Sequence, residues 1–502
     1  MDKKVKEKLE EVKKYNQRIS ELNKLSSLSY WDMKMSMPPK AIEQRANTLG
    51  FLSGEIFKMV TDDKVKEFIN FFDPIMDELD LVDRSMIKGL KKSYNEIKNI
   101  PQDKFEEYTV ATSLGEAAWE EAKAKKDFTI FKPKLEKIIS LLREFTEYYG
   151  YEENKYDALL NQYEEGLTVK KVDKLFNELK EGIINLLNRI NNSNKLVTSK
   201  KLNGKYSIEA QKELSEYLLD VIKFDKEAGR LDETTHPFTL NMGNKDVRIT
   251  THYYEDNLLS NIFSVIHEGG HALYEQHIPD SLVNTGLDGG VSMGIHESQS
   301  RFYENIVGRS KEFLSFILPY IKEKFTNLAD ITLDEFYEAV NYVNPSLIRT
   351  EADELTYSLH IIIRYEIEKA LINGEIEVED LPKVWNKKYE EFLGVIPKDD
   401  EEGVLQDMHW SAGNIGYFPS YALGNLYGGQ FLNTMLKDNP TAISDLTNGD
   451  LTYINNWLRD NIHVYGGVYT PDELVEKVTG EALSTKYFLD YLEGKYTKIY
   501  KL

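Results

Sequence analysis

The sequence predicts a mainly α-helical protein with one small β-sheet. Along most of the chain, charged residues are interleaved with Leu, Ile, Phe and Tyr at a spacing of three to four residues, the period of an amphipathic helix. Prolines at positions 38, 39, 101 and 133 are expected to separate the helical segments. The helices expected in the first part of the chain cover residues 1 to about 25, 40–72, 76–98, 104–127, 132–163 and 168–192.

A short segment at residues 234–252 breaks the helical pattern. It contains two runs rich in β-branched and aromatic residues, separated by Gly243 and Asn244, a pair typical of a tight turn. We therefore expect a small β-hairpin there. Two further helices are expected at about 258–278 and 292–308, joined by a glycine-rich loop.

The composition limits the possible functions. The 502 residues include 62 Lys and Arg against 84 Asp and Glu, a net charge of −22 that would repel nucleic-acid phosphates. There is no cysteine, so disulfides and thiol nucleophiles are excluded and any metal has to bind to His, Asp and Glu. No apolar signal segment is visible, and the longest stretch without charged side chains, 408–436, is too rich in Gly and Asn for a membrane helix. We expect no membrane contact and a cytoplasmic location.

The histidines are unevenly distributed. All nine lie at or after residue 236, and six of them fall between positions 236 and 296. We therefore expect one functional unit, 1–502, in which residues 1–230 form a mostly helical scaffold or cover. The half 231–502 is expected to carry the metal and substrate motifs.

The motif HEGGH at residues 267–271 is the strongest functional signal. On a helix, His267 and His271 lie on one face about 6 Å apart and can bind one metal ion at bond lengths of about 2.1 Å. Glu268 is then placed to act as general base toward a metal-bound water, and peptide hydrolysis fits this set best. Neighbouring apolar residues predict that the motif is partly buried. The paired glycines predict that another segment packs closely against the helix.

The third metal ligand has to come from outside the motif. His277 has the spacing of another metallopeptidase signature, but Tyr274 replaces the glycine that lets the helix end there. We predict Glu297, on the next helix, as the third ligand, because two His and one Glu form a catalytic zinc set that leaves a position for water. Glu304 and His296 are the alternatives.

Several further motifs occur in order along the chain. They are Tyr-Trp-Asp at 30–32 with Met37-Pro38 and the Arg45 helix, HPF at 236–238, DVRIT at 246–250, HESQ at 296–299, IRTEADEL at 348–355 and GVLQDMHW at 403–410. Together with HEGGH, these motifs resemble those of the carboxypeptidase Taq family, metallocarboxypeptidases of bacteria and archaea, over essentially the full length.

The resemblance to this family implies an activity and an architecture. It implies release of single C-terminal residues from peptides with broad side-chain tolerance. It implies an elongated helical zincin fold similar to neurolysin and angiotensin-converting enzyme, with a deep substrate groove. It also implies a homodimer and one divalent metal per chain, with zinc expected and cobalt able to support activity.

A carboxypeptidase has to bind the free carboxylate of its substrate. Arg349 is the candidate, because a guanidinium pairs with a carboxylate through two parallel hydrogen bonds. A helix expected from Pro345 places Arg349 and Asp353 on one stripe, so spacing alone favours an ion pair between them on a surface helix. The match to the family's IRxxADEL motif favours the carboxylate-binding role instead.

Five other side chains are candidates for substrate contacts. His409, Tyr417 and Tyr421 lie in a Gly- and Pro-containing segment expected to form a loop. In related helical zincins a tyrosine and a histidine of such a segment face the tetrahedral intermediate. We expect Tyr421 to stabilise the oxyanion, with His409 beside it and Tyr417 nearer the carboxylate. The alternative is that all three are ordinary aromatic side chains that only pack against their neighbours. His236 and Arg248 lie in the expected hairpin, where Arg248 can also pair with an aspartate two residues earlier.

Two other functions are compatible with parts of this pattern. An oligopeptidase or dipeptidyl carboxypeptidase would keep the metal residues but bind the terminal carboxylate differently or not at all. A catalytically silent peptide-binding protein would keep a structural metal. Glu268 argues against the silent protein, because a structural site needs no carboxylate between its two histidines.

Overall fold

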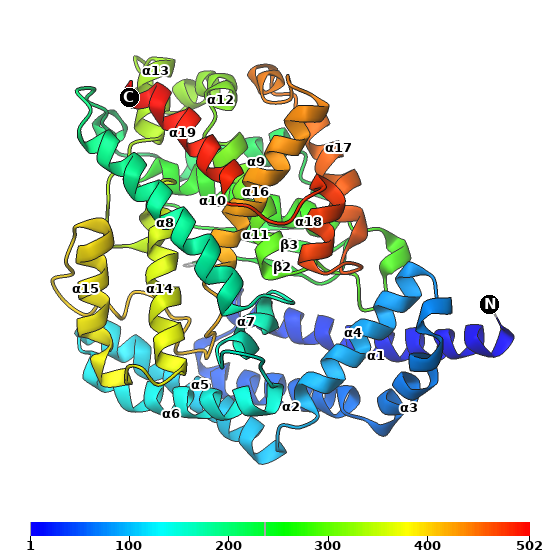
Figure 1. The fold of residues 1–502 in the computed structure, drawn as a ribbon. Helices are drawn as coiled ribbons and strands as arrows, with labels where there is room; N and C mark the ends of the chain where they lie inside the picture. Colours follow the sequence, from blue (N-terminus) through cyan, green and yellow to red (C-terminus); the bar gives the residue numbers. More distant parts are fainter. Residues whose placement is uncertain (1, 235–236) are drawn as a thin grey trace. The chain divides into compact units, whose positions relative to one another are not determined.

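The computed structural model of the chain describes residues 2–234 and 237–502, and most of them are helical (Figure 1). The helices before the sheet are α1 Lys3–Met35, α2 Ile42–Val60, α3 Asp63–Phe72, α4 Leu81–Ile97, α5 Gln102–Lys125, α6 Phe128–Tyr149, α7 Asp157–Tyr163, α8 Val169–Asn191 and α9 Ile208–Ile222. The helices after it are α10 Leu258–Gln276, α11 Met293–Arg301, α12 Lys311–Lys324, α13 Leu333–Val340, α14 Tyr357–Ile372, α15 Leu381–Leu393, α16 Pro419–Asp438, α17 Thr452–Asn461, α18 Pro471–Thr479 and α19 Lys486–Tyr500.

The chain divides into two compact units, each assembled from three segments. Unit 1 comprises Met1–Ile97, Thr198–Val340 and Phe431–Ala482. Unit 2 comprises Lys98–Val197, Asn341–Gln430 and Leu483–Leu502. These boundaries differ from the expected division near residue 230, because each unit combines segments that are far apart in the sequence.

The expected N-terminal helices are present with revisions: α1 extends beyond residue 25 to Met35, and the segment 40–72 forms two helices, α2 and α3. The segment 132–163 forms two helices, α6 and α7, because the chain leaves the helical conformation at Gly150, whose φ of 81° suits glycine. Pro133 does not precede α6, as the sequence suggested, but lies inside it, five residues after Phe128. Asp127 caps this helix by accepting a hydrogen bond from the Thr129 amide at 2.9 Å.

The small sheet has three strands in the order β1-β3-β2. The expected hairpin is confirmed as the antiparallel pair β2 Thr239–Asn241 and β3 Val247–Thr251. The strand β1 Gly229–Glu233 pairs in parallel with β3 and was not expected from the sequence. Parallel pairing has no turn signal of its own, which explains why hairpin chemistry did not reveal this strand.

Within unit 1, helix α10 packs against β3, α9 and α11 (Figure 1). Asn257 starts α10 by accepting a hydrogen bond from the Ser260 amide at 3.1 Å. Helix α11 continues into η5 Phe302–Val307, a π-helical turn, so that the expected helix at 292–308 is confirmed as two joined elements. The edge strand β2 also contacts α10, which places the sheet beside the HEGGH motif.

Within unit 2, helix α14 packs against α8 and α15. Trp385 and Tyr389 of α15 are almost completely buried. In the part of the chain that the structure describes, no helix is both long and apolar enough to cross a membrane.

Candidate metal centre

The two histidines of the HEGGH motif lie one turn apart on α10, as predicted. Their ring centroids are 4.9 Å apart. The apolar residues around them, Ile262, Val265, Ile266 and Ala272, are fully buried, which confirms that the motif lies on a buried helix. The helix therefore presents two imidazoles to one point and excludes most of the water around them.

The two glycines of the motif are explained by close packing, also as predicted. A Cβ atom on Gly270 would lie 2.8 Å from the Gln299 carbonyl oxygen and 2.9 Å from the Ser300 Cα, both in α11. A Cβ atom on Gly269 would lie 2.3 Å from the Ile222 Cδ1 of α9. Glycine thus lets α11 approach α10 closely enough to bring Glu297 toward the histidines.

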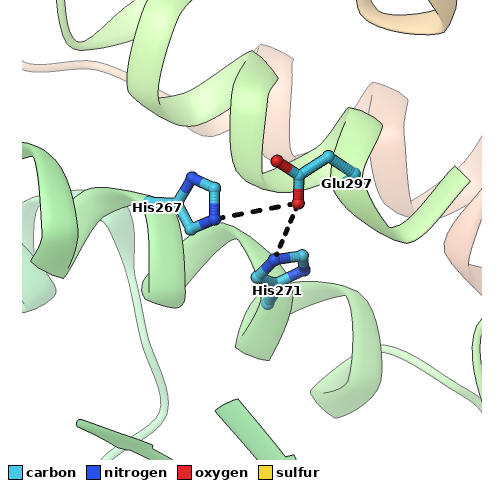
Figure 2. Close-up of side chains that lie close together, drawn as sticks. All are labelled: His267, His271 and Glu297. Carbon is cyan, nitrogen blue, oxygen red and sulfur yellow. Dashed lines mark ion pairs between the residues drawn. The ribbon is translucent and has the colours of Figure 1, made fainter. Parts of the chain in front are cut away.

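Glu297 completes a group of three ligand atoms (Figure 2). Its Oε2 lies 3.8 Å from the His267 Nε2 and 3.4 Å from the His271 Nε2. Ligand atoms bonded to a tetrahedral ion at about 2.1 Å are separated by about 3.4 Å. The observed separations fit such an ion, and among the described residues no other group of His, Asp and Glu forms a comparable site.

The second oxygen of Glu297 is held by an arginine. Arg301 donates from its Nε to Oε1 of Glu297 at 2.7 Å, which leaves Oε2 to face the histidines. Burial by itself would raise the pKa of Glu297, but the charges of Arg301 and His267 hold it well below its usual range. Glu297 is therefore a carboxylate with one oxygen directed toward the two Nε2 atoms.

The alternative ligands Glu304 and His296 lie behind the histidines. Glu304 Oε2 lies 2.8 Å from the His267 Nδ1, and the His296 Nδ1 lies 2.6 Å from the His271 Nδ1. Both therefore contact the nitrogens that face away from Glu297. Partners of this kind fix the orientation of a metal-binding imidazole.

His277 is separate from this group, which agrees with its rejection as a ligand. Helix α10 ends at Gln276, and His277 is its C-cap residue. The His277 ring stacks on the ring of His463, with centroids 5.2 Å apart. The two Nδ1 atoms of this pair are 2.9 Å apart.

Glu268 is buried beside the ligands and has one polar side-chain partner that the sequence did not reveal. Thr239, on the edge strand β2, donates its hydroxyl to Oε2 of Glu268 at 2.5 Å. Burial raises the pKa of the Glu268 carboxyl, an effect suited to a group that has to accept and release a proton. Only the fold brings β2 to α10, so sequence spacing could not identify Thr239.

Arg349 lies in unit 2, and its local structure differs from the expectation. It belongs to a short 3₁₀ turn, Arg349–Glu351, and no helix runs from Pro345. Asp353 is not its partner, because the Asp353 side chain accepts hydrogen bonds from the Thr356 amide and hydroxyl just before α14. Arg349 is instead buried and pairs with Asp407 through Nε at 3.0 Å and Nη2 at 2.9 Å. Its Nη1 donates to the Tyr357 hydroxyl at 3.1 Å.

A second arginine, which the sequence analysis missed, shares Asp407. Arg364 of α14 is fully buried and donates from Nε to Asp407 Oδ2 at 2.7 Å. Its remaining four N–H donors contact Asp407 again, Gln406, the His360 carbonyl and the Tyr389 hydroxyl. Burial by itself would raise the pKa of Asp407, but the charges of Arg364 and Arg349 hold it well below its usual range.

The three aromatic candidates lie near one another in unit 2. His409 Nε2 is 3.3 Å from the Tyr421 hydroxyl, and the His409 and Tyr417 rings are 5.6 Å apart. Tyr421 is not in a loop, as expected, but in the first turn of α16, which begins at Pro419. The His409 Nδ1 is buried and has no hydrogen-bond partner among the described residues. Burial lowers the pKa of His409 to about 3, so this imidazole is neutral near pH 7.

The two substrate-binding candidates of the hairpin region are Arg248 and His236. Arg248 forms two hydrogen bonds with Asp246, at 2.8 and 2.9 Å, and its guanidinium lies 5.5 Å from the centre of the Trp31 ring. It is therefore paired locally, which is the alternative that the sequence left open. His236 lies outside the described residues.

Comparisons with known proteins give a consistent picture. A model of the carboxypeptidase Taq (M32) metallopeptidase family matches residues 11–496. Carboxypeptidase 1 of Bacillus subtilis is 45% identical over 486 residues, which cover 97% of each chain. Thermostable carboxypeptidase 1 of Thermus thermophilus is 41% identical over 95% of this chain and 96% of that protein. A solved structure of a Pyrococcus furiosus carboxypeptidase superposes with a TM-score of 0.95, at 38% identity over 98% of this chain and 99% of that one.

Proposed function

Because the chain belongs to the carboxypeptidase Taq (M32) family of metallopeptidases, it is a metal-dependent peptide hydrolase, and we propose that it releases single amino acids from free C-termini. We propose broad tolerance for the residue that is removed. The observation that carries the proposal is the group formed by His267, His271 and Glu297, whose ligand atoms lie within 4.8 Å of one another beside a buried Glu268.

We assign His267, His271 and Glu297 as the ligands of one divalent metal, zinc in the first place, with cobalt as a substitute. Two imidazoles and one carboxylate are a donor set typical of catalytic zinc. A metal held there would polarise the scissile carbonyl and make water a stronger nucleophile. The neutral state of His271 suits this role, because burial lowers its pKa to about 3.

We assign Glu268 as the general base. Its carboxylate takes a proton from the attacking water and delivers it to the nitrogen of the leaving amine. The hydrogen bond from Thr239 supports this role, because it holds one carboxylate oxygen in place. We further propose that the substrate main chain pairs with the outer edge of β2, the edge strand that carries Thr239.

We assign Arg349 as the receptor of the terminal carboxylate. A guanidinium has five N–H donors, and the contacts of Arg349 with Asp407 and Tyr357 use three of them. Among the residues that the structure describes, no contact uses the other two donors, and we propose that these bind the carboxylate. Arg364 is unsuited to this role, because its contacts use all five donors.

The remaining assignments follow the family resemblance. We propose Tyr421 as the oxyanion donor, His409 as its neighbour and Tyr417 as a contact of the substrate. The unpartnered Nδ1 of His409 supports a role in ligand binding, because a buried polar atom of this kind is costly without a partner. His236 and Arg248 remain our candidates for substrate binding. We also propose that the protein is a cytoplasmic homodimer and that nucleic acids are not among its partners.

One experiment tests the proposed activity. Metal-loaded protein is mixed with a single peptide that carries either a free or an amidated C-terminus, and the products are followed by mass spectrometry. We expect a ladder that shortens one residue at a time from the free end, that a chelator abolishes and that is absent for the amide. Internal cuts or loss of two residues at a time would indicate an oligopeptidase or dipeptidyl carboxypeptidase. Binding without cleavage would leave a silent peptide-binding protein.

A further inference from the structure

The two ligand histidines are supported in different ways. The Nδ1 of His267 faces a carboxylate directly, at 2.8 Å from Glu304. The Nδ1 of His271 faces another imidazole, at 2.6 Å from the Nδ1 of His296. Two ring nitrogens at this distance need one proton between them, because two lone pairs or two N–H groups would repel each other.

The direction of this hydrogen bond follows from the position of the metal ligands. His271 turns its Nε2 toward Glu297, at 3.4 Å, so this nitrogen is the one available to a metal. A neutral imidazole that binds through Nε2 carries its proton on Nδ1. His271 is therefore the donor, and the Nδ1 of His296 is the acceptor.

The far side of His296 is consistent with this assignment. If its Nδ1 accepts, its proton lies on Nε2, and this nitrogen is 2.6 Å from Oε1 of Glu275. A carboxylate is an acceptor, so each link of the chain has one donor and one acceptor. Glu275 also accepts from the Gly290 amide at 3.2 Å and from the Asn241 side chain. The carboxylate is thus buried but well supplied with donors.

The surrounding packing holds the His296 ring in this position. A Cβ atom on Gly290 would lie 2.7 Å from the Cδ2 of His296 and 2.9 Å from the Cε1 of Tyr274, so the loop backbone lies directly against both rings. The His296 side chain is 17% exposed and that of Glu275 is 5% exposed. His296 comes from α11 and Glu275 from α10, so the chain also links the two helices that supply the metal ligands.

We propose that His296 and Glu275 form a relay that fixes the tautomer and orientation of His271 and thereby increases the metal affinity of the site. Both are positioning residues, because they act through His271 and touch neither the substrate nor the metal. This inference rests on the proposed metal site. It assigns His296 a role equivalent to that of Glu304, with an imidazole inserted between the ligand and the carboxylate.

Metal affinity tests the relay without relying on activity. The dissociation constant for Zn²⁺ is measured on the full-length apoprotein by competition with a chromophoric chelator, and circular dichroism monitors the fold. His296→Leu removes the acceptor of His271 and should weaken zinc binding by about 10- to 100-fold, the usual effect of losing such a partner. His296→Asn, whose amide oxygen can replace the Nδ1 but cannot reach Glu275, should lie between this variant and the parent.

Control variants separate the possible outcomes. His277→Leu removes a histidine of the same region that pairs with His463 instead, and it should leave the zinc constant unchanged. His271→Ala should abolish tight binding, and parental affinity in this variant would refute the metal site itself. A zinc constant for His296→Leu within twofold of the parent would overturn the relay alone. If His296→Leu does not fold, Glu275→Gln decides, since the relay predicts weaker binding there and parental affinity would contradict it.

Discussion

Replacement of Gly270 by alanine should weaken metal binding, although Gly270 is not one of the proposed ligands. The added Cβ would meet backbone atoms of α11, the Gln299 oxygen at 2.8 Å and the Ser300 Cα at 2.9 Å. Backbone atoms cannot rotate away as side chains do. The two helices therefore have to separate at Gln299 and Ser300, two and three residues after Glu297.

The size of the effect can be worked from these distances. Ordinary contact begins at 3.4 Å, so α11 has to move by about 0.5 Å. Overpacking of this kind costs about 1–3 kcal/mol, and the better helix propensity of alanine returns about 1 kcal/mol. We expect the free energy of unfolding to fall by about 0–2 kcal/mol. Metal–ligand distances tolerate about 0.2 Å, so the shift of Glu297 should weaken zinc binding by about tenfold or more.

Gly269→Ala is the matched control, because it adds the same methyl group to the same helix. Its Cβ would meet the Cδ1 of Ile222 at 2.3 Å, the end of a flexible side chain that can change its rotamer. Zinc affinity is measured by chelator competition and stability by urea unfolding of the apoproteins. We expect parental zinc affinity for Gly269→Ala and reduced affinity for Gly270→Ala. Equal affinity of the Gly270 variant and the parent would refute the claim that this contact positions Glu297.

Three other predictions concern the base, the carboxylate receptor and acid stability. Glu268→Gln should bind zinc like the parent but lower kcat by about 10³-fold or more in a peptide-cleavage assay, and substantial residual turnover would remove Glu268 from the base role. Arg349→Lys keeps the charge beside Asp407 but loses the parallel donors, so kcat/KM for free peptides should fall about 10- to 100-fold, mainly through KM; an unchanged value would place the receptor elsewhere. Burial, followed by the charge of Arg459, lowers the pKa of His277 to about 4 in the folded protein. As the pH falls below 6.5, this imidazole therefore takes up a proton in the unfolded chain before it does so in the folded protein. Stability should therefore decrease between pH 6.5 and 4, and His277→Asn should remove about 3 kcal/mol of this decrease in urea unfolding; equal pH profiles of variant and parent would contradict it.

The elements that the sequence predicted correctly are those with local signals. The apolar period around the HEGGH motif defined α10, and the turn at Gly243 defined the hairpin of β2 and β3. The strand β1 was missed because it pairs with β3 in parallel and has no connecting turn to reveal it. The helix expected from Pro345 was wrong because Asp353 bonds to the backbone and hydroxyl of Thr356, so that helical structure begins only after it.

The three residues of the candidate metal site could be predicted from the sequence, whereas the roles of the acidic and histidine residues around them could not be told apart. Glu297 and Glu304 are seven residues apart and share one face of the helical segment formed by α11 and η5. Sequence spacing therefore allows either carboxylate to reach a metal, and His296 adds a third choice. The structure separates them by which nitrogen of each imidazole they face. That distinction depends on the distance between α10 and α11, which the sequence suggests only through Gly270.

The buried polar cluster around Arg349 and the one around His267 differ in the charge of the ligand that each favours. In unit 2, two guanidinium groups share the single carboxylate of Asp407, so the cluster of Arg349, Arg364 and Asp407 has a net positive charge. Buried charge is costly unless it is paired. Within the described residues, the contacts of Arg349 leave two N–H donors unused and those of Arg364 leave none, which supports the proposal that Arg349 binds a carboxylate. In unit 1, burial alone would lower the pKa of His267, but the carboxylates of Glu297 and Glu304 raise it, so that cluster attracts positive charge. The proposed activity matches both clusters: a divalent cation would bind to the cluster of unit 1, and the terminal carboxylate of a peptide would bind to Arg349 in the cluster of unit 2.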